Sequence, residues 1–462
     1  IPLPMRRSPF YLRKNWNKAM ADLTQSLMDD VAAMTGAPVQ PVLSGRVLRF
    51  DGQMLECDGF PACVGSVCTV ATTTGDLTLA EVIGFNRGRN QLFLYESGAP
   101  IQAGARVTMR DDGSMIAVGP GLLGRVTDAL GDPLDELPAP VLADRWPLNG
   151  KTINPLARNP VREPLDVGVR VVNGLLTAGR GQRLGIIAGS GVGKSVLLSM
   201  MTRFSAADVI VVGLIGERAR EVGAFVHEVL SPESRPRVSV VAVPADRSPL
   251  LRIRAAKRAT AIAEYFRSQG KQVLLIMDSL TRVAHAQREI GLSLGEQPTV
   301  KGYPPSVVSL IPRLIERSGA GIGAEGAITA IYTVLADGDD TTNDPVVDTA
   351  RAILDGHIVL SRAQAQMGIY PAVDVSQSIS RVMGDIVDPR QAKAAQRFRQ
   401  LVSLFLENRD LMLMGGYTPG QDAELDAAVK LWPQIVAYIR QGQGERADFA
   451  ASSKALIALM PS

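Results

Sequence analysis

The sequence predicts an α/β protein in which a small N-terminal β-barrel precedes a core with a parallel sheet and a C-terminal helical domain. Three observations support this order. Short strand-like segments with turns come first, strongly apolar strands that alternate with helical stretches follow, and helical patterns dominate the end. The chain has 462 residues, of which 46% are hydrophobic and 21% charged. At about 100–200 residues per domain, this length accommodates roughly two to four domains.

The barrel is expected between residues 42 and 118, where β-type runs are separated by turns such as Asp51-Gly52 and Gly75-Asp76. Evenly spaced short strands with such turns are typical of a small barrel or sandwich. The expected strands are Val47–Phe50, Ser66–Val70, Leu77–Ile83, Gln91–Tyr95 and Arg106–Met109. Residues 119–164 are rich in Gly, Pro and Asp and are expected to form a structured linker.

The core is expected in residues 165–384. Its apolar runs are dominated by Val, Ile and Leu, as strands of a parallel sheet buried on both faces require. These runs are Leu184–Ala188, Val209–Gly216, Val238–Val243, Val273–Asp278, Ile328–Leu335 and His357–Leu360. Residues 385–462 are expected to be helical, most clearly at Arg397–Leu406 and Glu424–Tyr438.

Composition excludes several classes of protein. Mean hydropathy is +0.10 and no apolar run approaches the ~20 residues that a spanning helix needs, which excludes a membrane-embedded protein. A net charge of +3 is too balanced to indicate a nucleic-acid-binding protein. Cys57, Cys63 and Cys68 contain no CxxC pair and lie far from every histidine. Neither a zinc site nor a disulfide framework is expected, so the chain is predicted to be cytosolic and reduced.

Basic residues are concentrated at the start of the first segment, residues 1–41. They are Arg6, Arg7, Arg13, Lys14 and Lys18. No apolar region follows them, so a secretory signal is not predicted. Two interpretations stay open: a flexible tail, and a short amphipathic segment in peripheral contact with acidic lipid or with a partner.

A glycine-rich loop, Gly189–Ser195 (GSGVGKS), joins the strand Leu184–Ala188 to the helical run Val196–Phe204. This order of strand, loop and helix is the context in which a Walker A match predicts a site for nucleotide phosphates. The opening glycine of the pattern is replaced by Ala188, at the end of a strand where a methyl group is tolerated. A dinucleotide-binding GxGxxG is excluded because its third glycine position is Lys194.

The loop offers three kinds of group to a nucleotide. Backbone N–H groups can point at phosphate oxygens, and the N-terminus of the following helix adds partial positive charge. These N–H groups are expected from Gly189, Ser190, Gly191, Val192 and Gly193. Lys194 supplies a point charge for the outer phosphates, and Ser195 offers a hydroxyl to Mg²⁺.

Two carboxylates are expected at the carboxyl ends of strands, where ligands collect in a parallel sheet. Asp278 ends an apolar strand in the Walker B form and is expected to hold Mg²⁺ through water. Glu217 follows Val209–Ile215 and is placed to orient or deprotonate an attacking water. Arg218 is placed to pair with a terminal phosphate. A solvated Glu217-Arg218 pair that caps the next helix is an equally open interpretation.

Two motifs identify a superfamily. Gly216–Glu221 (GERARE) resembles the GER-x-RE motif of catalytic subunits in rotary ATPases. Pro371–Ser380 (PAVDVSQSIS) fits the alpha/beta ATPase signature P-[SAP]-[LIV]-[DNH]-x3-S-x-S at every defined position. The resemblance runs from about residue 45 to the C-terminus and implies a barrel, a RecA-like P-loop core and a helical tail.

Within this superfamily the chain is most similar to the type III export ATPases. The segments that carry this similarity are Val273–Ile290 (VLLIMDSLTRVAHAQREI), Gly302–Pro305 (GYPP) and Ala352–Leu360 (AILDGHIVL). The loop GSGVGKS, Asn408-Arg409-Asp410 and Leu431-Trp432-Pro433 resemble the flagellar branch more than the virulence-secretion branch.

The resemblance implies ATP and Mg²⁺ as ligands and assigns a role to each matched residue. Lys194 and Ser195 would bind phosphates and Mg²⁺, and Asp278 would be the Walker B residue. Glu217 would be the catalytic carboxylate, and Arg218 would contact the γ-phosphate.

Three further residues are implied at greater sequence distance. Tyr370 would stack on adenine, and Tyr417 would border the adenine pocket. Arg381 matches the arginine finger that one subunit supplies to its neighbour. The structural alternatives are that Tyr370 is a core aromatic residue and that Arg381 forms a surface ion pair. In the rotary synthase the catalytic glutamate and this arginine come mainly from different chains. Here Glu217 and Arg381 share one chain, so a homohexamer is expected.

The implied function is ATP hydrolysis that energises type III protein export in the cytoplasm, at the inner face of the membrane export apparatus. The implied partners are stator and stalk proteins, the export gate and substrate–chaperone complexes, with no nucleic acid. Alternatives are a virulence secretion ATPase, a rotary ATP synthase catalytic subunit and a Rho-type RNA translocase. Against the last, the barrel lacks the cluster of aromatic and basic residues that single-strand binding uses.

Overall fold

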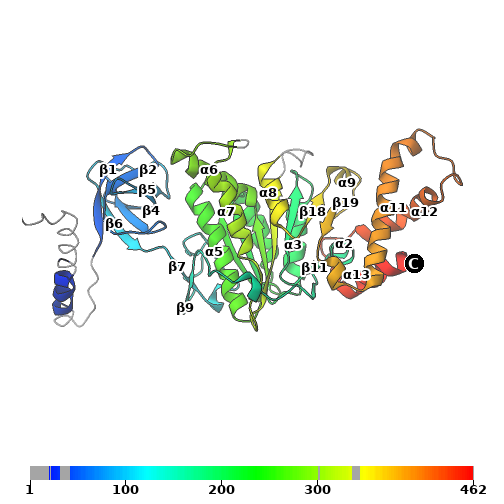
Figure 1. Cartoon of the computed structure of the whole chain (residues 1–462), viewed down its shortest axis with the longest axis horizontal. Coiled ribbons are helices and arrows are strands. Elements are labelled where there is room, and N and C mark those ends of the chain that lie inside the picture. The colour runs from blue at the N-terminus through cyan, green and yellow to red at the C-terminus, as the bar shows by residue number, and fades with distance from the viewer. Residues whose placement is uncertain (1–19, 21, 32–41, 300–301, 336–343, 461–462) are drawn as a thin grey trace, which may run out of the picture. The chain divides into compact units, whose positions relative to one another are not determined.

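The computed structural model describes residues 20, 22–31, 42–299, 302–335 and 344–460 and divides into two compact units (Figure 1). The first unit comprises residues 1–94 and 98–112, and the second comprises residues 95–97 and 113–462. The basic residues at positions 6–18 lie outside the described residues, so both interpretations of that segment stay open. No helix within the described ranges is long and apolar enough to cross a membrane.

A closed antiparallel barrel with the strand order β1-β2-β5-β4-β3-β6 forms the body of the first unit. Its strands are β1 (Ser44–Phe50), β2 (Met54–Asp58), β3 (Val67–Ala71), β4 (Leu77–Asn86), β5 (Arg89–Leu94) and β6 (Arg106–Asp111). Closure comes from β1, which pairs with β2 and with β6. Val47, Leu55 and Leu92 are buried in its apolar core. The predicted barrel is confirmed, with β2 as a strand that the sequence analysis did not anticipate.

The second unit contains a central sheet with the strand order β19-β18-β12-β17-β15-β13-β14-β8. Its strands are β8 (Val126–Thr127), β12 (Arg183–Ala188), β13 (Val209–Ile215), β14 (Val238–Val243), β15 (Gln272–Asp278), β17 (Ala327–Leu335), β18 (Gly356–Leu360) and β19 (Val373–Ser380). Neighbours along this order pair in parallel except β18 with β19. Every residue of β13 and β14 is buried, which explains their nearly continuous apolar sequence. The predicted parallel sheet is therefore confirmed.

The segment expected to be a linker, residues 119–164, contributes strands to the second unit. β8 joins the edge of the central sheet beside β14, where Val240 N donates to Arg125 O at 3.0 Å. β9 (Asp144–Pro147) pairs with β7 (Met115–Val118). Because β8 has two residues and β9 has four, neither is long enough for its alternation to be recognised in the sequence.

Helices connect the strands and cover the sheet. They include α3 (Lys194–Phe204), α4 (Ala219–Val229), α5 (Pro249–Ser268), α6 (Leu280–Ser293), α7 (Pro305–Glu316) and α8 (Pro345–Ile353). α5 is buried along most of its length because it packs against β13, β14 and β15. Figure 1 shows α5, α6 and α7 side by side, and α6 contacts both of the others.

The C-terminal part is helical, as predicted, with α11 (Pro389–Leu413), α12 (Ala423–Ile439) and α13 (Phe449–Leu459). These helices pack on one another and on α2 (Arg170–Leu175). The Phe398 and Tyr438 rings meet at a centroid distance of 5.6 Å, and the Tyr438 hydroxyl donates to Ser452 O at 2.9 Å. α11 also contacts β19, so the helical part is attached to the core sheet at that strand.

Candidate active site

The phosphate loop follows β12, which lies between β18 and β17 in the sheet. Gly191 and Gly193 have φ angles of +78° and +89°, a left-handed conformation that glycine adopts without strain. Val192 between them is buried and anchors the loop in the core. α3 begins at Lys194 with no side chain capping its N-terminus, so its first backbone N–H groups suit an anion.

Three charged side chains meet beside this loop. Lys194 Nζ lies 2.5 Å from Asp278 Oδ1 and 3.5 Å from Glu217 Oε1. The side chains of Lys194, Asp278 and Glu217 are only 12%, 5% and 11% exposed. They come from the start of α3, the end of β15 and the residue two positions after β13. The structure thus brings together three residues that the sequence analysis selected from separate segments.

The backbone around Glu217 is fixed by neighbouring loops. Gly216 N donates to Val243 O at 2.7 Å, and Ala245 N donates to Glu217 O at 3.0 Å. Gly216 has a φ of +71°, and a Cβ there would lie 2.9 Å from the Arg282 side chain. Glycine is therefore required at this close approach, which places Glu217 at the carboxyl edge of the sheet.

The surroundings of Glu217 shift the pKa of its carboxyl group. Burial raises the pKa of Glu217 above its ordinary value, and the negative charge of Asp278 raises it further. Lys194 acts in the opposite direction but does not outweigh these two effects. A carboxylate whose pKa is raised accepts a proton more readily, as a general base must.

Sequence reasoning missed Thr333. Its hydroxyl donates to Asp278 Oδ1 at 2.6 Å from β17, the strand between β12 and β15. In the sequence it is one of three hydroxyl-bearing residues of the apolar run Ile328–Leu335, with Thr329 and Tyr332, so nothing distinguishes it there. A buried hydroxyl needs a partner, and here the partner is the Walker B carboxylate.

Arg218 and Tyr370 lie near the cluster in different ways. The Arg218 side chain is 77% exposed, and its Nη1 lies 3.4 Å from Glu221 Oε1. It therefore pairs with the first turn of α4. Tyr370 is 46% exposed, and a Cβ placed on Gly193 would lie 3.5 Å from its ring. Its ring is thus directly beside the phosphate loop.

Arg381 and Tyr417 lie away from the cluster. Arg381 N donates to Asp355 O at 2.9 Å, and the Asp355 carboxylate accepts from Arg183 N at 3.0 Å. Because Arg183 begins β12 and β19 runs antiparallel to β18, Arg381 lies at the amino edge of the parallel strands. The Tyr417 hydroxyl donates to Asp426 Oδ1 at 2.5 Å, and no described contact joins Tyr417 to the phosphate loop.

The donor set suits a magnesium ion. Ser195 is exposed at the start of α3, and Asp278 ends β15. A hydroxyl and a carboxylate, completed by phosphate oxygens and water, match the octahedral oxygen coordination of Mg²⁺. Glu217 Oε1 is buried and makes no hydrogen bond, and its described contact is the 3.5 Å ion pair with Lys194. Within the described ranges, no group of three or more His, Cys, Asp and Glu side chains is arranged to hold a metal by itself.

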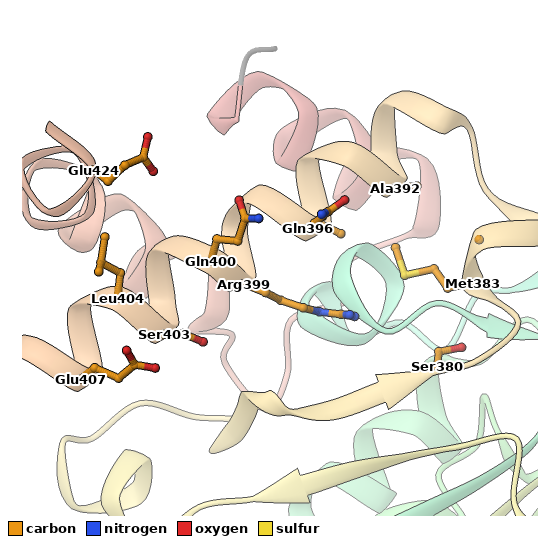
Figure 2. Close-up of a pocket in the computed structure, with 12 residues that line it drawn as sticks. Ser380, Met383, Ala392, Gln396, Arg399, Gln400, Ser403, Leu404, Glu407 and Glu424 are labelled. Carbon is orange, nitrogen blue, oxygen red and sulfur yellow. The ribbon is translucent and has the colours of Figure 1, made fainter.

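Two cavities differ in their relation to this site. A larger one of about 880 Å³ is lined by Ser380, Met383 and side chains of α11 such as Arg399 and Gln400 (Figure 2). It contains none of the predicted site residues. A smaller cavity of about 120 Å³ touches the phosphate loop at Gly189 and Val192.

A phosphate loop on a central strand, with a lysine and two carboxylates at the carboxyl edge of a parallel sheet, defines a P-loop ATPase with a RecA-like core. The ATP synthase alpha/beta family, nucleotide-binding domain, matches residues 168–380. The T3SS EscN ATPase C-terminal domain matches residues 387–458. The chain belongs to the type III export ATPases of the ATP synthase alpha/beta superfamily.

Individual relatives agree with this family. The flagellum-specific ATP synthase of Pseudomonas aeruginosa is 52% identical over 426 residues, covering 92% of this chain and 94% of the relative. The type 3 secretion system ATPase of Xanthomonas euvesicatoria is 46% identical over 399 residues, covering 86% and 89%. The assembled ATPase EscN of enteropathogenic E. coli, solved in complex with its central stalk EscO, is 39% identical with a TM-score of 0.83, covering 90% of this chain and 100% of that one.

Proposed function

We propose that this chain hydrolyses ATP to ADP and phosphate with Mg²⁺, and that hydrolysis drives type III export of flagellar subunits. The observation that carries the proposal is the buried contact of Lys194 with Asp278 and Glu217 beside an uncapped helix N-terminus. The flagellar assignment is supported by the higher identity to the flagellum-specific relative, 52% against 46% for the secretion-system relative.

Each residue of the cluster has a proposed task. Lys194 holds the outer phosphates, while Ser195 and Asp278 hold Mg²⁺, Asp278 through water. A bound Mg²⁺ supplies charge neutralisation at the phosphate oxygens. Glu217, with its raised pKa, orients the attacking water and accepts its proton once Lys194 has turned to the phosphates.

The proposed contacts to the rest of the nucleotide differ in what they require. Tyr370 stacks on adenine, which its half-exposed ring beside Gly193 supports. Arg218 pairs with Glu221 and turns from it to reach the γ-phosphate. The Tyr417 hydroxyl donates to Asp426, a contact that Tyr417 can keep while its ring borders the adenine.

The proposed assembly is a homohexamer in which Arg381 completes the site of a neighbouring subunit. Glu217 and Arg381 occur in one chain but lie at opposite edges of its sheet. Head-to-tail contacts that close into a ring would bring the amino edge of one copy to the carboxyl edge of the next. The assembled form of the 39% identical EscN supports this arrangement.

The proposed setting is the cytoplasm, at the inner face of the membrane export apparatus. A stalk protein is supported as a partner by the EscN–EscO complex. Stator proteins, the export gate, substrate–chaperone complexes and a peripheral lipid contact of the basic segment complete the proposed set of contacts.

The test measures ATP hydrolysis and flagellar export for the same variants. Lys194→Ala should abolish ATP hydrolysis by the purified chain and fail to restore flagellar export in a strain that lacks its own export ATPase. Lys271→Ala, at an exposed lysine on the same unit, should leave both intact. Hydrolysis that requires a second chain type would contradict the homohexamer and indicate a rotary synthase subunit. Stimulation by RNA would indicate a translocase, and rescue of virulence secretion alone would overturn the flagellar assignment.

A further inference from the structure

The two oxygens of the Asp278 carboxylate have different surroundings. Oδ1 accepts from Lys194 Nζ at 2.5 Å and from Thr333 Oγ1 at 2.6 Å. No donor to Oδ2 is found within the described part of the chain. Both contacts therefore fix one oxygen and leave the other for water or a metal ion.

Thr333 is held rigidly where it meets this carboxylate. Thr333 is fully buried on β17, where it pairs in register with Ile186 of β12. The alternative acceptor, Met277 O, is farther away at 3.4 Å. A hydroxyl has one proton to donate, and the short contact to an ionised oxygen is the stronger of the two.

In the proposed function, the contribution of Thr333 increases when nucleotide binds. In the proposed function Lys194 turns to the outer phosphates and no longer holds Oδ1. Thr333 is then the remaining donor to that oxygen among the described residues. Without it the Asp278 carboxylate would be free to rotate at the moment when the metal site must be ordered.

We propose that Thr333 is a positioning residue for the metal site: its hydroxyl holds Asp278 Oδ1 so that Oδ2 faces the water shell of Mg²⁺. The proposal rests on the proposed nucleotide site and extends it to a residue on a third strand. Partners that orient metal-site carboxylates typically change metal affinity by about 10–100-fold when they are removed.

The test measures the affinity of the full chain for a fluorescent ADP analogue with Mg²⁺ and with a chelator. Thr333→Val keeps the side-chain shape but removes the hydroxyl. It should reduce the affinity gain that Mg²⁺ provides by roughly tenfold, with metal-free affinity unchanged. Thr333→Ser should restore most of that gain, because it keeps the hydroxyl.

A matched control separates positioning from structural damage. Thr329, also buried on β17, accepts from Gly181 N at 2.9 Å and has no contact with Asp278. Thr329→Val should lower thermal stability as Thr333→Val does, while the increase in nucleotide affinity that Mg²⁺ provides stays at the wild-type value. If Thr333→Val does not fold, Thr333→Ala replaces it in the same comparison.

Three results would overturn the proposal. The first is a folded Thr333→Val or Thr333→Ala protein in which Mg²⁺ increases nucleotide affinity as much as in the wild type. The second is a Thr333→Ser protein, and the third a Thr329→Val protein, in which this increase is reduced as much as in Thr333→Val. Failure of the proposed function looks different, because the wild-type chain would then show no Mg²⁺-dependent nucleotide binding at all.

Discussion

The two edges of the central sheet differ in how they hold their charged groups. At the carboxyl edge, Lys194, Asp278 and Glu217 are buried together within hydrogen-bond or ion-pair distance. At the amino edge, Arg381 is exposed, and its described side-chain hydrogen bond is a long one of 3.4 Å to Arg351 O. One edge is organised before any ligand arrives, whereas the other presents a cation with no carboxylate partner among the described residues.

In the proposed mechanism neither edge is sufficient alone. The carboxyl edge holds the proposed base and metal-site residues, and Arg218, the arginine proposed there for the γ-phosphate, is paired with Glu221. The amino edge holds Arg381, at the edge opposite to the proposed base Glu217. Since stabilising the charge of a transferred phosphoryl group requires a cation, the contrast favours a site completed between two copies of the chain.

The largest expected effect comes from the amino edge. Arg381→Ala should reduce turnover by about 10³–10⁵-fold, the range reported for an arginine finger, while nucleotide affinity changes little. Steady-state hydrolysis and analogue binding measure the two quantities. Arg390→Ala is the matched control, because Arg390 is an exposed arginine nearby that pairs with Asp388. Normal turnover in Arg381→Ala would remove the amino edge from the mechanism.

The next effect concerns the base at the carboxyl edge. Glu217→Gln should retain nucleotide binding and lose about 10²–10⁴-fold in turnover, because an amide accepts a proton poorly. Glu228→Gln, at an exposed position of α4, should behave like the wild type. A collapse of ATP affinity in Glu217→Gln would instead make Glu217 a structural residue.

A smaller effect is expected at the metal. Asp278→Asn should raise the Mg²⁺ concentration at half-maximal activity by about 10–100-fold, because a charge near the cation is lost. A Mg²⁺ titration of hydrolysis measures it, with Asp246→Asn, an exposed aspartate after β14, as the control. An unchanged midpoint would argue against Asp278 as a metal-site residue.

The smallest effect is on stability. The pKa of Glu217 is raised in the folded state, so its charged form disfavours folding above its ordinary pKa of 4.5. This cost is fully present above the folded-state pKa and disappears as the pH falls to 4.5. Glu217→Gln should therefore melt higher than the wild type at pH 8, with a difference that shrinks toward pH 4.5. A variant that melts lower at pH 8 would show that the Lys194 pair outweighs burial.

Local patterns explain why most of the carboxyl edge was predictable. The left-handed backbone of the phosphate loop before Lys194 requires glycines, and Asp278 ends a continuous apolar run. Each feature can therefore be recognised from a few neighbouring residues of the sequence. Glu217 was found because it too follows a buried strand.

Features that depend on distant packing were not predictable. Thr333 looks like any strand threonine until the sheet order places β17 beside β15. β8 is too short to show a period, and it is a strand only because β14 offers an open edge. Which way Arg218 turns depends on Glu221, and its side-chain conformation leaves no pattern in the sequence.

The most direct test of a site shared between the two edges is a mixture of Arg381→Ala and Glu217→Gln chains. Each variant alone should be inactive as a ring. Mixed rings contain some interfaces with an intact Glu217 on one side and an intact Arg381 on the other, so hydrolysis at limiting ATP should recover. Mixed rings, verified as mixed, that remain as inactive as either parent would show that Arg381 serves its own chain, and would contradict completion of the site by a neighbour.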